Sequence, residues 1–158
     1  MVNILFVCSG DTCRSPIISA IFNDEIRKAN KSNVVMSSSA GLFVNPSDTE
    51  ISEDAKFALR EFNILNFSHT PTSLTEDLVI KSDLIICVNS SIKNCILTKM
   101  KNTKNVKSVS DYIAGVEIAD PFGKGRAVYL KLCSDVKVLV IKLIDILCKE
   151  GVILWLLQ

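Results

Sequence analysis

The sequence has almost no net charge, no long hydrophobic run and no internal repeat. Its 18 basic and 17 acidic residues leave a formal charge of +1, so neither nucleic acid nor an anionic membrane is expected as a partner. No apolar stretch reaches the roughly 20 residues that a membrane-spanning helix needs. No basic segment precedes the apolar start, so we expect no signal peptide. The 158 residues are expected to form a single domain, 1–158, and to act as a monomer.

The six cysteines lack the close-set spacing of a secreted disulfide framework. We therefore expect free thiols in a reducing compartment, and the cytoplasm is the predicted location. Cysteine is also among the most frequently buried residue types. Cys133 and Cys148 lie on or beside the apolar side of the last predicted helix, so we interpret both as core residues.

Apolar runs of strand length alternate with amphipathic segments of helix length. We predict strands over 2–8, 33–41, 83–89 and within 105–113, and helices over 16–29, 52–64, 73–82, 91–100 and 127–150. The last helix is expected to bury a stripe formed by Val128, Leu132, Val136, Leu139, Leu143 and Ile146. This alternation predicts an α/β fold with a parallel sheet and helices on both faces, which binds ligands beyond the carboxyl ends of its strands.

The segment "CSGDTCRS", residues 8–15, leaves the first predicted strand at that end. A loop that runs from a strand into a helix can point several backbone N–H groups at an anion, and the helix N-terminus adds partial positive charge. Gly10 is expected to supply a backbone conformation closed to most residues. Ser15 is predicted as the N-cap and Pro16 as the first helical residue.

Two side chains of this segment give the predicted anion site a chemical function. Arg14 can curl back and hold two oxygens of a tetrahedral oxyanion. The same charge and dipoles favour a thiolate at Cys8, so we expect its pKa to fall below the free value of about 8.5. A thiolate in the floor of an anion site is suited to nucleophilic attack at phosphorus. A nucleotide P-loop is excluded because the Gly-Lys-Ser/Thr ending is absent. The alternative is that Cys8 is a buried structural cysteine.

The stretch "VCSGDTCRSP" resembles the signature of the low-molecular-weight protein tyrosine phosphatases. The similarity covers nearly the whole chain, since "SAG" at 39–41, His69 followed by "LT", "DLIICVNSSIK" at 83–93 and "DPFG" at 120–123 stand in the family's order. The resemblance implies a doubly wound domain around a four-stranded parallel sheet. It also implies phosphorylated proteins as partners, and neither a cofactor nor a metal is expected.

The resemblance further implies a role for each matching residue. Cys8 would attack the phosphomonoester to give a phosphocysteine, Arg14 would hold the equatorial oxygens, and Asp120 would be the general acid. Ser15 would stabilise the leaving thiolate. The loop would be supported by Ser15, Ser39 and His69. Cys13 would protect Cys8 by forming a reversible disulfide with it. The phosphate- and substrate-binding residues would be Ser9, Gly10, Asp11, Thr12, Cys13, Arg14, Ser15 and Phe122.

Thr12 and the pair Phe122-Gly123 depart from the eukaryotic members of the family. Eukaryotic members usually have Ile in place of Thr12 and two aromatic residues after Asp-Pro. Both departures resemble the bacterial branch that includes protein-arginine phosphatases. We therefore place phosphotyrosine first as the substrate and phosphoarginine second.

Two other functions remain open at this point. Thioredoxin-coupled arsenate reductases also resemble this family, and Cys87 and Cys95 lie where such an enzyme would need further cysteines. However, Cys87 falls within an apolar predicted strand, where a core thiol is the better interpretation. The other alternative is a weakly catalytic phosphate-binding module, which Asp11 brings into consideration.

Asp11 stands where the family nearly always has Asn. A carboxylate there is expected to raise the pKa of the Cys8 thiol and to weaken phosphate binding. By the resemblance it would face Ser15, Ser39 and His69, and a protonated His69 can neutralise it. The alternative is that Asp11 turns outward into solvent.

The C-terminal tail "VILWLLQ", residues 152–158, is more apolar than a solvated end. Packing against its own domain is the first interpretation, and a partner-binding patch is the second.

Overall fold

The computed structural model describes residues 1–153, and its centre is a four-stranded sheet. The strands are β1 (Val2–Cys8), β2 (Val35–Gly41), β3 (Leu84–Cys87) and β4 (Val106–Ser108). Their order across the sheet is β2-β1-β3-β4, and every neighbouring pair is parallel. The prediction of an α/β fold around a four-stranded parallel sheet is confirmed.

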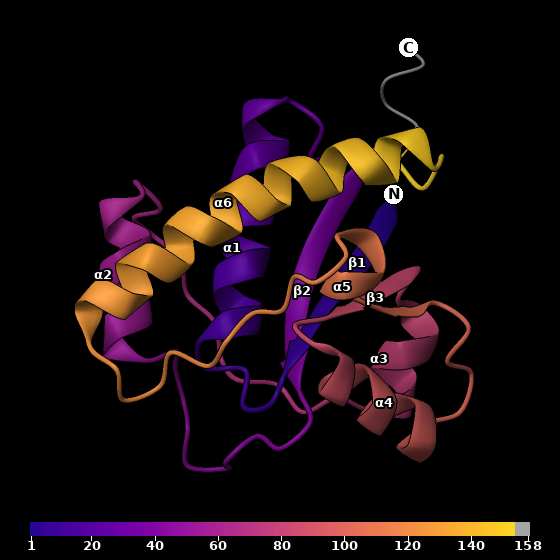
Figure 1. Ribbon diagram of the computed structural model, residues 1–158, viewed down its shortest axis with the longest axis horizontal. Helices are drawn as coiled ribbons and strands as arrows, with labels where there is room; N and C mark the ends of the chain where they lie inside the picture. Colours follow the sequence, from indigo (N-terminus) through magenta and orange to yellow (C-terminus); the bar gives the residue numbers. More distant parts are fainter. Residues whose placement is uncertain (154–158) are drawn as a thin grey trace.

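Helices cover both faces of the sheet. They are α1 (Arg14–Lys28), α2 (Glu53–Glu61), α3 (Glu76–Lys81), α4 (Ser90–Lys99), α5 (Val109–Tyr112) and α6 (Arg126–Lys149). Helix α1 packs on β1 and β2, and Figure 1 shows α6 crossing in front of α1. Helix α4 packs against β3 and β4. The crossovers through α1 and α4 run in opposite directions across the sheet, so their right-handed geometry puts these two helices on opposite faces.

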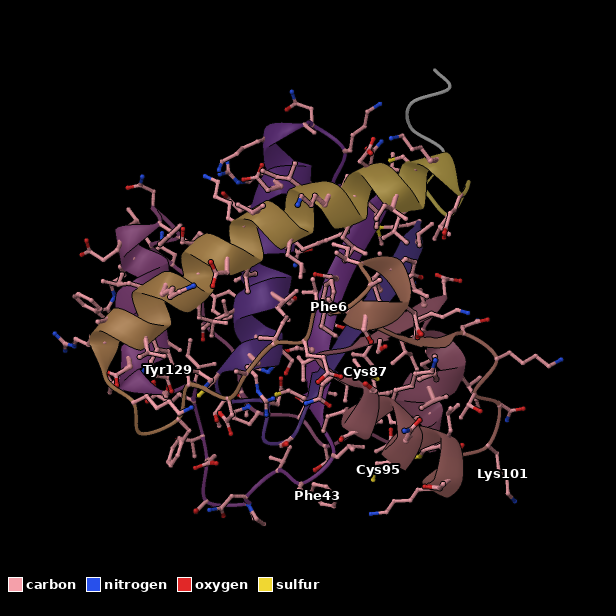
Figure 2. The ribbon with its side chains drawn as sticks, viewed as in Figure 1. Phe6, Phe43, Cys87, Cys95, Lys101 and Tyr129 are labelled. Carbon is pink, nitrogen blue, oxygen red and sulfur yellow. The ribbon has the colours of Figure 1, made fainter. Side chains whose placement is uncertain are left out.

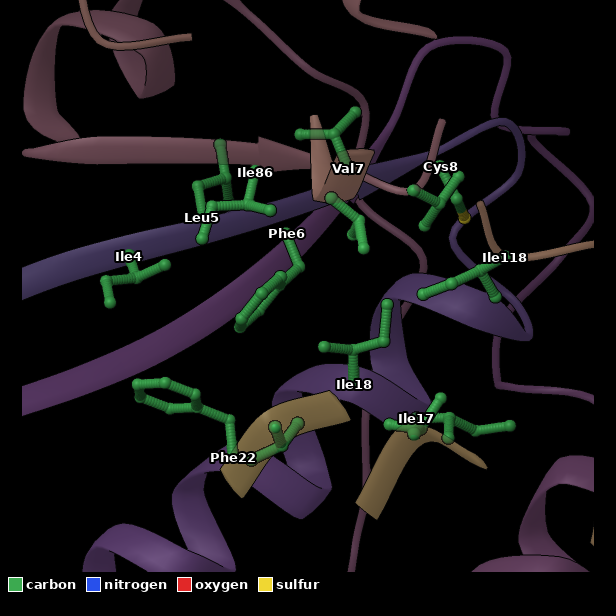
Figure 3. Packing of buried hydrophobic residues seen from close by; sticks show 14 of the residues in the cluster. Ile4, Leu5, Phe6, Val7, Cys8, Ile17, Ile18, Phe22, Ile86 and Ile118 are labelled. Carbon is green, nitrogen blue, oxygen red and sulfur yellow. The ribbon is translucent and has the colours of Figure 1, made fainter. Parts of the chain in front are cut away.

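Strand β1 lies at the centre of the core, and its last five residues are all buried. A strand that is apolar on both sides is expected where helices cover both faces of a parallel sheet. Phe6 of β1 meets Phe22 of α1 edge to face, with ring centroids 5.6 Å apart, and Ile18 lies beside them (Figure 3). This packing fixes the carboxyl end of β1, which carries Cys8, against the start of α1.

Helix α6 buries three of the six predicted stripe residues, Val136, Leu139 and Leu143, and differs from the prediction toward its two ends. Its buried residues are Tyr129, Cys133, Val136, Leu139, Val140, Leu143, Leu147 and Cys148. Of the predicted stripe, Val128 is exposed, and Leu132 and Ile146 are only half-buried. Tyr129 takes the place predicted for Val128 because its hydroxyl reaches Cys13 at the start of α1 and Ser52 at the start of α2. The prediction that Cys133 and Cys148 are core residues is confirmed.

The ends of β4, which lies within the predicted range 105–113, and of α2 have local causes. Strand β4 ends at Ser108, and the chain enters α5 at once, because the Asp111 carboxylate accepts the Ser108 backbone N–H at 2.7 Å. Helix α2 ends at Glu61 rather than at residue 64, since Asn63 takes a left-handed backbone conformation with φ of 61°.

Only the first two residues of the predicted apolar tail fall within the described residues. The backbone N–H groups of Val152 and Ile153 both donate to the Leu147 carbonyl, and Ile153 is fully buried. Residues 154–158, on which most of the tail prediction rests, lie outside the described residues. Within residues 1–153, no helix is both long enough and apolar enough to cross a membrane.

Candidate active site

The loop between β1 and α1 is held by backbone contacts with the segment that follows β2. Leu42 and Phe43 donate their N–H groups to the carbonyls of Cys8 and Ser9, at 3.1 and 2.8 Å. This close approach requires glycine at position 41. A Cβ atom on Gly41 would lie 2.6 Å from the Ser9 carbonyl oxygen and 3.0 Å from the Asp11 nitrogen. Gly41 was quoted in the sequence only as part of the "SAG" match, and nothing there indicated this contact.

The left-handed residue of the loop is Asp11, with φ of 56°, and not Gly10. A Cβ atom on Gly10 would meet only the Thr12 Oγ1, at 3.8 Å. The prediction that Gly10 supplies the special conformation is therefore wrong. Asp tolerates a left-handed backbone better than most residues do, and its side chain is stabilised by the buried partners described below.

Helix α1 begins at Arg14 with Cys13 as its N-cap, two residues earlier than predicted. Ser15 is thus the second helical residue, and the prediction that it caps the helix is wrong. Its hydroxyl contacts Cys8 Sγ at 2.9 Å and Asp11 Oδ1 at 2.8 Å instead. Pro16 is the third helical residue, where a missing N–H is still no loss because the first four N–H groups of a helix have no partner within it.

Cys8 lies in the floor of the loop and is only 2 % exposed. The Asp11 backbone N–H donates to Cys8 Sγ at 3.3 Å. Burial raises the pKa of the Cys8 thiol. This outweighs any hydrogen bond that Ser15 donates to Sγ, the hydrogen bond from the Asp11 N–H and the charge of Arg14, all of which lower the pKa. The prediction of a lowered pKa is wrong for this structure, because the sequence argument counted the dipoles and the guanidinium but not the loss of solvent.

Arg14 connects the loop with the segment that carries Asp120. Its buried guanidinium donates to the Ile118 carbonyl at 3.2 Å and to Ser9 Oγ at 3.5 Å. Its Nη2 atom also lies 3.8 Å from Asp120 Oδ2. The Asp120 side chain is 58 % exposed, and its Oδ1 accepts the Phe122 backbone N–H at 3.1 Å. The structure therefore places the predicted general acid at the solvent rim, beside the predicted anion-binding guanidinium.

Asp11 is fully buried and lies between three hydrogen-bonding partners. Its Oδ1 accepts the Ser15 hydroxyl, and its Oδ2 lies 2.6 Å from His69 Nε2 and accepts the Thr72 N–H at 2.9 Å. His69 Nε2 also lies 3.2 Å from Ser39 Oγ. The alternative that Asp11 turns outward is wrong. Of the expected neighbours, Ser15 and His69 contact its carboxylate, while Ser39 contacts His69. Thr72 takes part through its backbone, which leaves no signal in the sequence.

Cys13 is buried on the side of the loop that faces α6. Its Sγ lies 3.0 Å from the Tyr129 hydroxyl and 3.5 Å from Ser52 Oγ. Figure 2 shows Tyr129 near the start of α6, beside α2. Burial, together with the contact to Cys13, raises the pKa of the Tyr129 hydroxyl. To bond with Cys8, Cys13 would first have to leave these two hydroxyls. Tyr129 and Ser52 were not predicted as neighbours of the site.

Two exposed aromatic residues lie next to residues that contact the loop, and a threonine lies within the loop. Phe122 is 73 % exposed and follows Asp120 by two residues. Phe43 (Figure 2) is 62 % exposed, and its backbone N–H bonds to Ser9. Its ring lies under the Lys99 ammonium, 4.6 Å from Nζ to the ring centroid. Thr12 is half-buried, and its Oγ1 lies 3.6 Å from Cys13 Sγ. Phe43 was missed in the sequence because it stands outside the quoted motifs.

Cys87 and Cys95 do not resemble a redox relay in this structure. Cys87 is fully buried in β3, and that burial raises the pKa of its thiol to about 12. Cys95 is half-buried on α4 (Figure 2). The geometry favours the core-thiol interpretation of Cys87 over the arsenate-reductase alternative. Within residues 1–153, all six cysteines are free, and no three His, Cys, Asp or Glu side chains are grouped as metal ligands.

The fold and the site define a small α/β protein with an anion loop that contains a cysteine and an arginine. The family model of the low molecular weight phosphotyrosine protein phosphatases matches residues 3–152. The chain therefore belongs to this family, as its sequence motifs suggested, and it is by family a hydrolase of the protein phosphatase class.

The relatives carry two different substrate names. A protein-arginine-phosphatase of Bacillus subtilis is 30 % identical over 94 % of this chain and 99 % of its own length. The low molecular weight protein-tyrosine-phosphatase PtpB of Staphylococcus aureus is 27 % identical over 93 % of this chain and 100 % of its own.

Solved structures agree with this grouping. A low molecular weight protein tyrosine phosphatase from Bacillus subtilis matches with a TM-score of 0.85 and 29 % identity, over 95 % of this chain and 99 % of that one. The YwlE arginine phosphatase from Geobacillus stearothermophilus matches with a TM-score of 0.82 and 26 % identity, over 96 % of both chains.

Proposed function

We propose that the protein is a cysteine-dependent phosphatase that hydrolyses phosphotyrosine in proteins through a phosphocysteine intermediate. In this proposal residues 1–158 form one phosphatase domain, which works as a monomer in the cytoplasm on phosphorylated proteins. The observation that carries the proposal is the position of Arg14. Its guanidinium lies between the loop that holds Cys8 and the rim that holds Asp120, 3.8 Å from the Asp120 carboxylate.

In the first step, the Cys8 thiolate attacks phosphorus, an S–P bond forms, and the P–O bond to the tyrosine breaks. Arg14 and the loop N–H groups hold the equatorial oxygens, where negative charge develops. The protonated Asp120 carboxyl gives its proton to the leaving phenolate oxygen. Its exposed position at the rim, near Arg14 rather than in the loop floor, supports this role.

In the second step, water attacks phosphorus and the S–P bond breaks. The Asp120 carboxylate accepts the proton of the attacking water, so that inorganic phosphate leaves and the carboxyl is ready for the next cycle. The Cys8 thiolate that departs is stabilised by the Asp11 backbone N–H and by the hydroxyl of Ser15, both of which lie within contact of Sγ.

Phe43, whose backbone N–H bonds to Ser9, and Phe122, whose N–H bonds to Asp120, both have exposed rings, and these support an aromatic substrate because a phenyl ring that stacks on them gains buried area. The second candidate substrate is phosphoarginine, which keeps the same steps with a P–N bond in place of the P–O bond. Two observations favour it. Thr12 provides a hydroxyl in the loop, and relatives of this chain carry the name of arginine phosphatases.

The test is an assay of the unmodified protein on matched phosphotyrosine and phosphoarginine peptides, with phosphate release as the readout and Cys8→Ser as the control. We expect turnover of the phosphotyrosine peptide, and a loss of several orders of magnitude in Cys8→Ser. Faster release from the phosphoarginine peptide would replace the first substrate by the second. Phosphate binding without single-turnover formation of a phosphoenzyme would contradict the proposal and indicate a binding module.

A further inference from the structure

The hydroxyl of Ser15 has one proton and two close neighbours that compete for it. Ser15 Oγ lies 2.8 Å from Asp11 Oδ1 and 2.9 Å from Cys8 Sγ, and the Ala40 carbonyl oxygen is farther away at 3.4 Å. A serine hydroxyl donates one hydrogen bond and can accept two. If it donates to Asp11, it can only accept from Cys8.

The surroundings of Asp11 decide where this proton points. Asp11 is fully buried, and its Oδ2 atom is already bound by the Thr72 backbone N–H and by His69 Nε2. An ionised carboxylate only accepts hydrogen bonds, and all its side-chain and backbone neighbours here can donate. A buried carboxylate oxygen left without a donor is costly. Oδ1 therefore takes the Ser15 proton, and the 2.9 Å contact between Ser15 and Cys8 requires Cys8 to donate its S–H.

We propose that Asp11 is a positioning residue that turns the Ser15 hydroxyl away from Cys8 and so holds the resting nucleophile as a neutral thiol. The inference rests on the proposed function, in which Cys8 is the nucleophile. To react, Cys8 must pass its proton to a phosphate oxygen of the bound substrate or to water. The Ser15 hydroxyl must also turn toward Sγ, which breaks its hydrogen bond to Asp11.

Of the other charged groups near Cys8, some favour its thiolate and some favour its neutral thiol. Arg14 favours the thiolate, and the Asp11 backbone N–H points at Sγ. Asp120 lies against Arg14 at 3.8 Å and partly offsets its charge. A protonated His69 compensates the charge of Asp11, but it donates to Oδ2 and leaves the bond between Oδ1 and Ser15 in place. Protonation of His69 therefore does not release the Ser15 hydroxyl.

The variant Asp11→Asn reverses the direction of this bond with almost no change in shape. Asn tolerates the left-handed backbone at φ of 56°. Its Oδ1 can accept from Thr72 and His69, while its amide N–H₂ donates to Ser15 Oγ. The hydroxyl proton of Ser15 is then free to point at Cys8 and to stabilise a thiolate.

The test measures the pH at which Cys8 is half as reactive toward iodoacetamide as its fully ionised form, with Cys8 and Cys13 distinguished by mass-spectrometric fragmentation. The midpoint, unlike the absolute rate, does not depend on how accessible Cys8 is. We expect Asp11→Asn to lower the midpoint by about one pH unit or more, a tenfold gain in thiolate at a fixed pH. In a Ser15→Ala background, Asp11→Asn should lower the midpoint by less than half of that shift, because only the direct effect of the Asp11 charge remains.

Equal shifts with and without Ser15 would overturn the proposal, since Asp11 would then act by charge alone. No shift in Asp11→Asn would overturn it as well. Should Ser15→Ala fail to fold, the unmodified protein still decides, because the proposal requires a midpoint at or above the free-thiol value of about 8.5, and any lower midpoint would contradict it. Failure of the proposed function is separate, since it would appear as absent phosphate release whatever the midpoint is.

Discussion

Replacing Gly41 by alanine tests whether the loop's position, and not only its chemistry, sets the reaction rate. The added Cβ would lie 2.6 Å from the Ser9 carbonyl oxygen, 2.9 Å from Val44 Cγ2 and 3.0 Å from the Asp11 nitrogen. An ordinary contact begins at 3.4 Å, so the loop must move by about 0.8 Å at Ser9. Two of the three obstructing atoms belong to the backbone of the loop and cannot turn aside.

A displacement of about 1 Å in a catalytic group can cost a factor of about 100 in rate, and overpacking of this kind destabilises a protein by about 1–3 kcal/mol. We expect Gly41→Ala to lower kcat/KM on an aryl phosphate by about 100-fold, while thermal unfolding shows a folded protein with a reduced Tm. Inorganic phosphate should inhibit the variant more weakly, because the displaced N–H groups are those proposed to hold it.

The matched control combines Gly41→Ala with Val44→Ala. Removing Val44 Cγ2 relieves the side-chain contact and leaves both backbone contacts in place. We therefore expect little recovery of activity in the double variant. Full recovery would refute the reasoning, because it would assign the effect to Val44 and not to the loop. Unchanged kcat/KM in Gly41→Ala alone would show that the loop tolerates the displacement.

The remaining predictions concern the acid, the core thiols and the substrate. Asp120→Ala should slow hydrolysis much more for phosphates with poor leaving groups than for activated aryl phosphates, because only poor leaving groups need a proton; equal slowing in steady-state assays would remove Asp120 from this role. With pKa values raised by burial to about 12, the Cys87 and Cys133 thiols are ionised in about one molecule in 10,000 at pH 8. Both should stay unlabelled by iodoacetamide until the protein unfolds, and rapid native labelling would contradict their burial. Thr12→Ile should lower activity on a phosphoarginine peptide more than on a phosphotyrosine peptide, and an unchanged ratio would show that Thr12 does not select the substrate.

The parts of the fold that depend on local pattern could be predicted from the sequence. Strand β1 was predicted with its observed limits, because an apolar run that ends in a polar, glycine-containing segment indicates where a buried strand ends. The spacing of Cys8 and Arg14 also sufficed to place both at the junction of a strand and a helix. The resemblance, rather than the pattern, indicated Asp120, since Asp-Pro alone is a common turn.

The predictions that failed concern features that depend on contacts between segments far apart in the sequence. At the start of α6, Val128 and Tyr129 are both candidates for burial, and the partners of Tyr129 near α1 and α2 decide that Tyr129 is the buried one. The pKa of Cys8 depends on a burial that no local motif reveals. Gly10 was the natural choice for an unusual backbone, but the stabilising contacts of Asp11 come from residues 58 and 61 positions away.

Asp11 shows how folding and reactivity set different demands on one position. The site needs a side chain that accepts from the Thr72 backbone N–H and contacts His69. Asp and Asn both meet this demand and both tolerate the backbone, so folding alone does not choose between them. They differ in charge and at the atom that faces Ser15, where Asp accepts a hydrogen bond and Asn donates one. The identity of this residue therefore affects the state of Cys8 more than the shape of the loop, which is why a substitution that leaves the fold intact can be used to test the chemistry.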